Sequence, residues 1–232
     1  MKTLINQQKN KYRPILYFGI VFAIIFALWV YLVASNSNFI SAFDKNVYNF
    51  IRNRNSTEWK FAVLWTNMGN TVTIVCITVV LVIALAIFKR YAYAIFSAVT
   101  MALANGCNWI IKHLVQRQRP RYSASLHAEG FSFPSGHSVG SMSLAIVLIF
   151  LICLMVKKKG LKIFLSILSA LFTLSIGFTR MYLHVHWPSD VCGGWLEGLT
   201  FGLICGFILL KITESKKQEN NYQSHIIENF YS

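Results

Sequence analysis

The segment KHLVQRQRPRYSASLHAEGFSFPSGH, residues 112–137, is a polar stretch between two long apolar stretches of the chain. It ends in the compact run Pro134-Ser135-Gly136-His137. Four cations lie along it: Lys112, Arg117, Arg119 and Arg121. Irregular polar backbone is not stable in hydrocarbon, whereas long apolar helices are. The segment therefore predicts a loop between two membrane-spanning helices, and its cations indicate that the loop receives an anion.

The composition of the whole chain supports this prediction. Of 232 residues, 55% are hydrophobic and 13% are charged, against about 25% charged in ordinary soluble domains. Six apolar stretches each hold roughly the 17–25 residues that a helix needs to cross a bilayer. They cover about 15–34, 71–88, 91–111, 137–156, 161–178 and 190–210. We therefore predict an all-α fold, an integral membrane bundle of six transmembrane helices.

A chain with so many spans has room for one folded domain. We predict one membrane domain over residues 1–210 and a polar tail over residues 211–232, which lacks apolar periodicity and is expected to be disordered. A signal peptide is the alternative for the first 34 residues, but their apolar run exceeds the typical length of about 7–15 residues. The five cysteines lie in or beside the predicted spans and form no CxxC pair, which favours packing over disulfide or metal roles.

The basic residues orient the bundle. The net charge of +14 is scattered between the spans and not gathered on one soluble face, so topology explains it better than a nucleic acid partner does. With residue 1 inside the cell, the inner segments hold 13 of the 22 basic residues. The positive-inside rule then predicts a multi-pass cell membrane protein with both termini in the cytoplasm.

A second polar segment, TRMYLHVHWPSD, residues 179–190, lies between the last two predicted spans. In a bundle of six spans with alternating directions, this segment and residues 112–137 fall on the same side of the membrane. With the termini inside, that side is the outer one. We therefore expect the two segments to meet and to form one phosphate site there.

The two segments together hold the groups that phosphoryl transfer requires. Arginine binds phosphate oxygens through paired hydrogen bonds and lysine acts as a point charge. Candidate cations are Lys112, Arg119 and Arg180. Ser135 and Gly136 stand at a predicted helix start, where backbone N–H groups and the helix dipole favour an anion.

Two histidines can supply the nucleophile and the acid. His186 stands four residues before Asp190, whose carboxylate can accept a hydrogen bond from one ring nitrogen and leave the other to attack phosphorus. His137 can then protonate the departing alkoxide.

These motifs resemble the three-part signature of the type 2 phosphatidic acid phosphatase superfamily. The parts stand in order and at the right spacing: Lys112 to Arg119-Pro120, Pro134-Ser135-Gly136-His137, and Arg180 with His186 and Asp190. Thr179 stands where the family usually has serine before the arginine, and it retains a hydroxyl.

The resemblance implies a metal-independent membrane lipid phosphatase that acts on phosphatidylglycerophosphate, undecaprenyl pyrophosphate or phosphatidate in the bilayer. In it His186 would form a phosphohistidine, Asp190 would orient this ring, and His137 would be the general acid. The phosphoryl oxygens would be held by Lys112, Arg119, Ser135, Gly136 and Arg180. No cofactor is implied, and of eight acidic residues only Asp190 and Glu197 lie near the predicted site, too few for a magnesium centre.

Two other functions fit parts of the pattern. A phosphotransferase on the same fold would pass the phosphoryl group to an acceptor other than water. An anion or lipid transporter is less favoured, because the chain shows no internal repeat of the kind that transporters often have.

Several residues stay open at this stage. Arg117 and Arg121 could contact lipid headgroups or help to recruit the anionic substrate. The Asn108 amide could hold Lys112 in place or form a hydrogen bond in helix packing. Glu197 fits a functional or a structural carboxyl. Residues 39–52 fit a helix lying on the bilayer or one packed on the spans. The remaining histidines are predicted to be packing or interface residues: His113, His127, His184 and His225.

One further pattern predicts packing inside the bundle. Glycines recur every four residues in the last span, at positions 194, 198, 202 and 206. Small residues in a row allow two helices to approach closely, so this face is expected to lie against another helix. No pattern in the sequence indicates an oligomeric state.

Overall fold

The computed structural model of the protein describes residues 12–51, 56–120 and 130–231. Within these ranges all regular elements are helices, which confirms the predicted all-α fold. They are α2 (Arg13–Ala34), α3 (Asn38–Phe50), α4 (Ser56–Thr66), the 3-10 turn η1 (Asn67–Gly69), α5 (Thr71–Ile87), α6 (Tyr91–Val115), α7 (Gly136–Met155), α8 (Lys159–Tyr182) and α9 (Pro188–Tyr231).

The number of membrane spans agrees with the prediction once a broken helix is counted as one span. Five of the described helices are long and apolar enough to cross a bilayer by themselves, namely α2, α6, α7, α8 and α9. The sixth candidate is a pair, Thr57–Gly69 and Thr71–Ile87, bent by 42°. The bend follows from Asn70, whose side chain accepts a hydrogen bond from the Val72 N–H and so starts a new helix.

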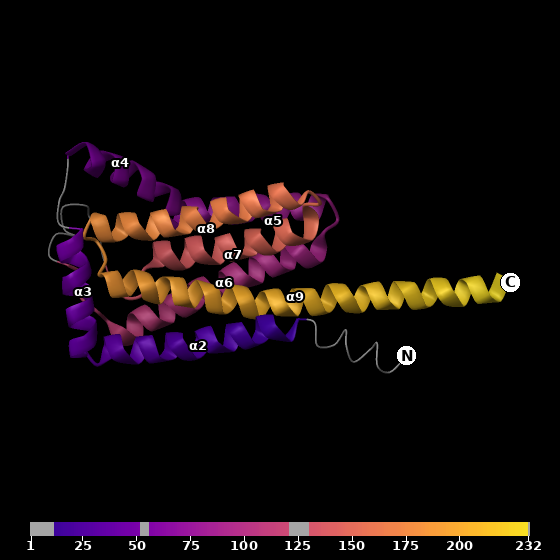
Figure 1. Cartoon of the computed structure of the whole chain (residues 1–232), viewed down its shortest axis with the longest axis horizontal. Coiled ribbons are helices and arrows are strands. Elements are labelled where there is room, and N and C mark those ends of the chain that lie inside the picture. Colours follow the sequence, from indigo (N-terminus) through magenta and orange to yellow (C-terminus); the bar gives the residue numbers. More distant parts are fainter. Residues whose placement is uncertain (1–11, 52–55, 121–129, 232) are drawn as a thin grey trace.

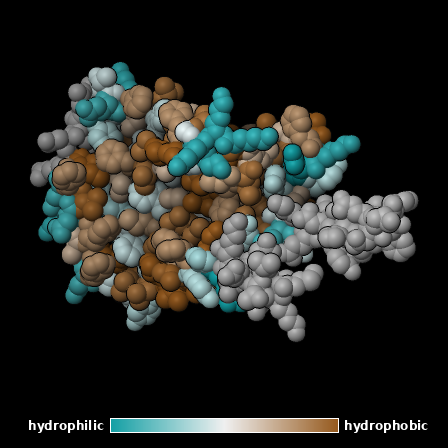
Figure 2. All heavy atoms as spheres, turned by 45° about the vertical axis from the view of Figure 1, so that its right-hand side comes forward, coloured by the Kyte–Doolittle hydropathy of each residue, from teal (hydrophilic) through white to brown (hydrophobic). Residues whose placement is uncertain are grey.

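The lateral surface of the bundle is apolar. Ile24, Val80 and Leu171 are each more than half exposed, and Figure 2 shows hydrophobic residues over much of the visible face. Such a continuous apolar surface is unfavourable in water, and it fits a helical bundle whose outer side contacts lipid tails.

The two polar segments lie at one end of the bundle. Figure 1 shows the α6–α7 and α8–α9 connections at the same end, with α3 running crosswise over it. The α5–α6 and α7–α8 turns, with Lys89, Arg90, Lys157 and Lys158, lie at the opposite end. The expectation that the two polar segments meet is therefore confirmed for their described residues.

The row of glycines in α9 packs against α7, as the four-residue spacing predicts. A Cβ atom at Gly198 would lie 2.8 Å from Met142 Cβ, and one at Gly194 would lie 2.8 Å from Ser135 O and from Ser138 Cβ. Gly202 and Gly206 meet Ile146 and Phe150 in the same way. The close contact brings the two helix starts together, and the Ser135 N–H donates to Asp190 O over 3.0 Å.

The prediction of a disordered tail after residue 210 is wrong for the backbone. Helix α9 continues through the polar tail to Tyr231 and extends beyond the rest of the bundle (Figure 1). No Gly or Pro follows Gly206 to end the helix, and the Lys, Glu and Gln residues of the tail are good helix formers. The lack of apolar periodicity therefore did not indicate a disordered backbone.

Candidate active site

His186 lies in the short connection between α8 and α9 and is almost completely buried, at 2% exposure. The neighbouring Leu183 and Val185 are buried as well and pack with Ile51 and Ala62. The hydroxyl of Tyr48, from α3, donates to the main-chain oxygen of His186 over 2.6 Å. The backbone on both sides of the ring is thus held by the surrounding helices.

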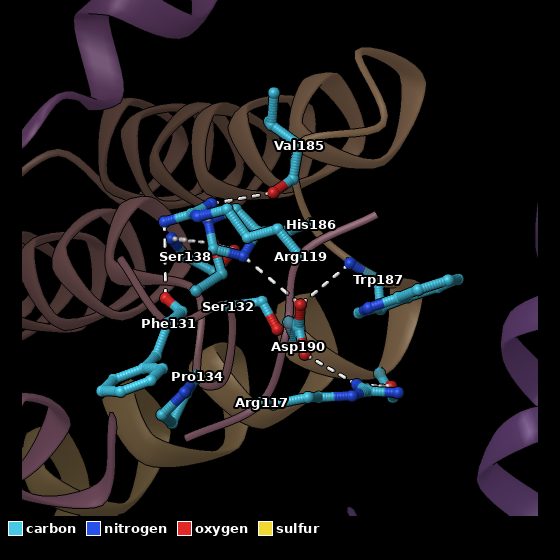
Figure 3. Close-up of polar contacts among 12 residues, drawn as sticks. Arg117, Arg119, Phe131, Ser132, Pro134, Ser138, Val185, His186, Trp187 and Asp190 are labelled. Atoms are coloured by element: carbon cyan, nitrogen blue, oxygen red, sulfur yellow. Dashed lines mark hydrogen bonds and ion pairs between the residues drawn. The ribbon is translucent and has the colours of Figure 1, made fainter. Parts of the chain in front are cut away.

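The contacts of the His186 ring define its tautomer. Nε2 lies 3.1 Å from Arg119 Nη1, and Nδ1 lies 3.4 Å from Asp190 Oδ2 (Figure 3). A guanidinium can only donate hydrogen bonds, so Nε2 must be the unprotonated acceptor. Nδ1 then carries the proton and faces the carboxylate. The arrangement presents the Nε2 lone pair to the cations, as a nucleophile requires.

Electrostatics also favour a neutral His186. Burial, and after it the charge of Arg180, lower the pKa of His186 well below its usual range. Arg119 and Lys112 act in the same direction. A histidine that stays deprotonated near neutral pH keeps the lone pair that attacks phosphorus.

Asp190 lies in the first turn of α9 and is fully buried. Its Oδ2 also accepts the Trp187 N–H over 2.9 Å, and its Oδ1 accepts from Arg117 Nη1 over 2.7 Å. These donors fix the carboxylate from the sides that His186 does not use. Asp190 is therefore held in the position that the prediction of an orienting carboxylate requires.

Three cations converge on this histidine. Arg119 also donates to the main-chain oxygens of Val185 and Gly130, over 2.8 and 3.0 Å. Lys112 donates to Phe131 O over 3.0 Å. Arg180 donates from Nη1 to Thr66 Oγ1 over 3.2 Å, while its buried Nε has no hydrogen-bond partner among the described residues.

An unpartnered guanidinium N–H in the interior is costly, because the group has lost its water. A phosphate oxygen would satisfy it. Lys112, Arg119 and Arg180 are close enough for their charges to act on both His137 and His186. The charges of all three cations thus act on both histidines.

Helix α7 begins at Gly136 with Ser135 as its N-cap, as predicted. The Ser135 hydroxyl caps the Ser138 N–H over 3.4 Å, and the Ser135 N–H is taken by Asp190 O. The first N–H groups of a helix have no partner inside the helix. At this helix start the groups left for an anion are therefore the N–H groups of Gly136 and His137, together with the Ser135 hydroxyl.

Two open residues are placed deeper in the bundle. Asn108 Nδ2 donates to Pro134 O over 3.3 Å and to Glu197 Oε2 over 3.4 Å, both in the interior. Asn108 therefore ties the loop before α7 to α9 and does not contact Lys112 through its amide. Glu197 is fully buried one level below Asp190. In the described part of the chain, no group of three His, Cys, Asp or Glu side chains is arranged to hold a metal ion.

Arg117 is the residue whose role the sequence did not show. Its guanidinium bridges two buried carboxylates, Asp44 and Asp190, over 2.7 Å each. Asp44 lies in α3 and is 3% exposed. Arg121 lies outside the described residues. Nothing in the local sequence distinguishes Arg117 from Arg121, since only the folded chain brings Asp44 to one of them.

The other described histidines make packing contacts, as predicted. His184 stacks on Tyr48 at a centroid distance of 4.2 Å, and the exposed His113 packs on Trp109 at 4.3 Å. His127 and the side chain of His225 lie outside the described residues.

Comparisons with known proteins show the family of the chain. The profile of the PAP2 superfamily matches residues 92–213, which include every predicted site residue. A lipid A 4'-phosphatase of Bacteroides thetaiotaomicron is 30% identical over 190 residues, 75% of this chain and 80% of that protein. A phosphatidylglycerophosphatase B of Bacillus subtilis is 33% identical over 102 residues, 43% of this chain and 50% of that protein.

A solved structure shares the fold. The crystal structure of a transmembrane PAP2 type phosphatidylglycerolphosphate phosphatase from Bacillus subtilis matches with a TM-score of 0.73. The match covers 86% of this chain and 97% of that chain at 20% sequence identity. The fold is therefore shared over most of the chain.

Proposed function

The chain belongs to the PAP2 superfamily and is a membrane lipid phosphatase, and on this premise we propose that it removes the terminal phosphate of a lipid phosphate or pyrophosphate through a phosphohistidine on His186. The observation that carries the proposal is the tautomer of this ring. Its Nε2 lone pair faces Arg119, while its Nδ1 proton faces Asp190.

In the first step the substrate phosphate replaces the direct contact between Arg119 and Nε2. Arg119, Arg180 and Lys112 bind the equatorial oxygens, and the start of α7 supplies backbone N–H groups. Nε2 attacks phosphorus, and the bond from phosphorus to the lipid oxygen breaks. His137 gives its proton to that oxygen, so the lipid leaves as an alcohol or as a lipid monophosphate.

In the second step water attacks the phosphohistidine from the side that the lipid has left. His137, now neutral, takes a proton from the water, and the bond from phosphorus to Nε2 breaks. Inorganic phosphate leaves and His186 is regenerated. Asp190 accepts the Nδ1–H throughout and stabilises the positive charge that the ring develops while phosphorus is attached.

We place the site at the outer membrane surface, with both termini and the tail after residue 210 in the cytoplasm. Support comes from the basic turns at the end of the bundle opposite the site, which contain Lys89, Arg90, Lys157 and Lys158. Basic residues are retained on the cytoplasmic side. A membrane-impermeant thiol reagent tests this in intact cells. A cysteine introduced at Asn36 should react and one introduced at Lys158 should not, and the reverse pattern would invert the topology.

The nucleophile is tested with purified protein in detergent. His186→Ala should release no phosphate and form no acid-labile phosphoenzyme, because Ala has no nucleophile. The exposed His113→Ala is the matched control and should keep the activity of the unaltered protein. Substantial phosphate release by His186→Ala would refute the nucleophile assignment.

A turnover panel then ranks the substrates. Phosphatidylglycerophosphate, undecaprenyl pyrophosphate, phosphatidate and diacylglycerol pyrophosphate present similar terminal phosphates, and each is supplied with EDTA. Free phosphate is expected in the presence of EDTA. A phosphorylated acceptor without free phosphate would instead indicate a phosphotransferase, and no turnover in detergent would favour a transporter.

A further inference from the structure

A chain of charged groups connects the candidate nucleophile to helix α3. Asp190 contacts His186 on one side and Arg117 Nη1 on the other, and Arg117 Nη2 contacts Asp44 Oδ2. Ser189 closes the chain, because its N–H and hydroxyl both donate to Asp44 over 2.8 Å. Figure 3 shows Arg117 and His186 on opposite sides of Asp190.

We propose that Arg117 and Asp44 are positioning residues for the reaction: Arg117 fixes the carboxylate that orients His186, and Asp44 balances the charge of Arg117 and connects α3 to the pair. This inference rests on the proposed function of His186 and Asp190. We call the chain of Asp44, Arg117, Asp190 and His186 the relay.

The geometry commits Arg117 to this role. Besides the two carboxylates, Nη1 donates to Ser189 Oγ over 2.6 Å, and the guanidinium lies 5.5 Å from the centre of the Trp187 ring. Its side chain is 15% exposed. A guanidinium with both arms engaged by buried partners has little capacity left for a lipid headgroup, which excludes the interface role considered from the sequence.

Asp44 is the unexpected member, because α3 is not one of the spans. A carboxylate buried to 3% exposure is strongly unfavourable unless it is paired. Here it accepts from Arg117 and twice from Ser189, the residue before Asp190. A movement of α3 over the end of the bundle would therefore displace the start of α9 through the contacts between Asp44 and Ser189.

The relay is not sealed inside the protein. Asp44, Arg117 and Trp187 form part of the wall of a cavity of about 680 Å³ between α2, α3 and residues 115–118. Polar groups that line such a cavity can be hydrated when a neighbour is removed. Neutral variants of Arg117 and Asp44 are therefore expected to fold, which makes the relay testable.

A positioning role and a merely structural role differ in their electrostatic consequences. His186 faces Asp190 of α9, Lys112 of α6, His137 of α7, Arg180 of α8 and Arg119 of the loop. Asp44 faces Arg117 and Cys192, and the exposed Lys45 lines the same cavity.

These groups are the same in every relay variant, so only the altered charge changes. Loss of the positive charge of Arg117 makes His186 and Asp190 easier to protonate. Loss of the negative charge of Asp44 makes them harder to protonate.

The experiment compares Arg117→Gln, Asp44→Asn and the double variant over a range of pH. We expect each single variant to lose roughly tenfold in kcat, as for other groups that orient a catalytic ligand, with a smaller change in KM. The acid limb of kcat/KM should move up by about half a pH unit in Arg117→Gln and down by a similar amount in Asp44→Asn. In the double variant the limb should return towards its original position.

Controls separate the relay from general damage. Lys45→Gln removes an exposed charge beside Asp44 and should leave both kcat and the limb unchanged. Arg117→Lys keeps the charge without the two-armed contact, so it should lower kcat while the limb stays in place. If Arg117→Gln fails to fold, Arg117→Lys and Asp44→Asn still test the two halves of the inference.

The inference is overturned if the acid limb of kcat/KM stays in place in Arg117→Gln and Asp44→Asn. It is also overturned if the limb moves in the same direction in both variants. Unchanged kcat in every single variant would overturn it as well. The proposed function has its own test, because a phosphoenzyme that persists in His186→Ala would remove the nucleophile itself. If His186→Ala is inactive while the acid limb of kcat/KM stays in place in the Arg117 and Asp44 variants, only the inference on the relay is refuted.

Discussion

The replacement of Asp190 by Asn tests the catalytic reasoning most directly, because it changes one charge and almost no volume. Arg117 can only donate, so the Asn carbonyl oxygen must take the position of Oδ1, 2.7 Å from Nη1. The amide nitrogen then takes the position of Oδ2, next to His186 Nδ1 and the Trp187 N–H. The Asn NH2 group, a donor, then faces His186 Nδ1–H and the Trp187 N–H. Both of these groups met the acceptor Oδ2 in the unaltered protein.

The His186 ring can relieve this conflict only by changing its tautomer. Nδ1 would accept from the Asn amide, and the proton would move to Nε2, the atom that must attack phosphorus. It would also point at Arg119 Nη1, which lies 3.1 Å away and is a donor itself. We therefore expect kcat to fall by about 10³ to 10⁴, as for an Asp to Asn change in a catalytic triad, or about 4–5.5 kcal/mol of barrier.

The assay is phosphate release from a lipid phosphate in detergent, with a rapid-quench measurement of phosphoenzyme and a thermal unfolding curve for each variant. Asp190→Asn should lose some stability, because the Trp187 N–H no longer meets an acceptor, although the contact with Arg117 is kept. Asp190→Ala, which leaves Arg117 without this partner, should be less stable. If Asp190→Asn retains activity within about tenfold, the tautomer argument is refuted.

Two further predictions follow from the site and its packing. Because burial holds the pKa of His186 below its usual range, the acid limb of kcat/KM should lie below the ordinary value of about 6.5; a limb above that value would contradict this assignment. The unfolded chain takes up this proton first, so His186 should lower the free energy of unfolding as the pH falls from about 6.5 towards its folded pKa, measurable by denaturation at several pH values. Gly194→Ala should destabilise the protein by about 1–3 kcal/mol and lower activity, since its Cβ would lie 2.8 Å from Ser135 O. Gly160→Ala, with nothing within 4 Å, is the control in thermal unfolding and phosphate release, and equal effects would contradict the packing argument.

The sequence allowed the spans and the meeting of the two polar segments to be predicted for physical reasons. A span needs a fixed length of apolar residues, and an even number of crossings separates the two polar loops. His186 and Asp190 stand four residues apart, so their contact is largely local. Lys112 and Arg180 reach the same place because helices α6 and α8 end at the same side of the bundle.

The relay could not be predicted in this way. Arg117 meets Asp44 across 73 residues of sequence and through a helix that lies outside the spans. On the sequence, Asp44 has the pattern of a solvated face, since Lys45 and Asn46 follow it. Its burial depends on how α3 lies over the bundle, which no periodicity expresses. Residues 61–88 hold no charged side chain, and the cap at Asn70 divides them into two helical parts.

The charges of the site give the relay a chemical reason. In the proposed site Lys112, Arg119 and Arg180 bind the phosphate, and Arg117 adds a fourth cation behind Asp190. With the carboxylates of Asp44 and Asp190, these six side chains carry a net charge of +2, to which His137 adds one when it is protonated. A phosphate monoester near neutral pH carries up to about two negative charges.

Asp44 therefore does more than bury an ion pair. Without it the group would carry one more positive charge, and we expect release of inorganic phosphate to be slower. In this proposal an aspartate on α3 favours the release of a dianion from the site. Asp44→Asn should accordingly bind inorganic phosphate more tightly as a competitive inhibitor, whereas Arg117→Gln should bind it more weakly.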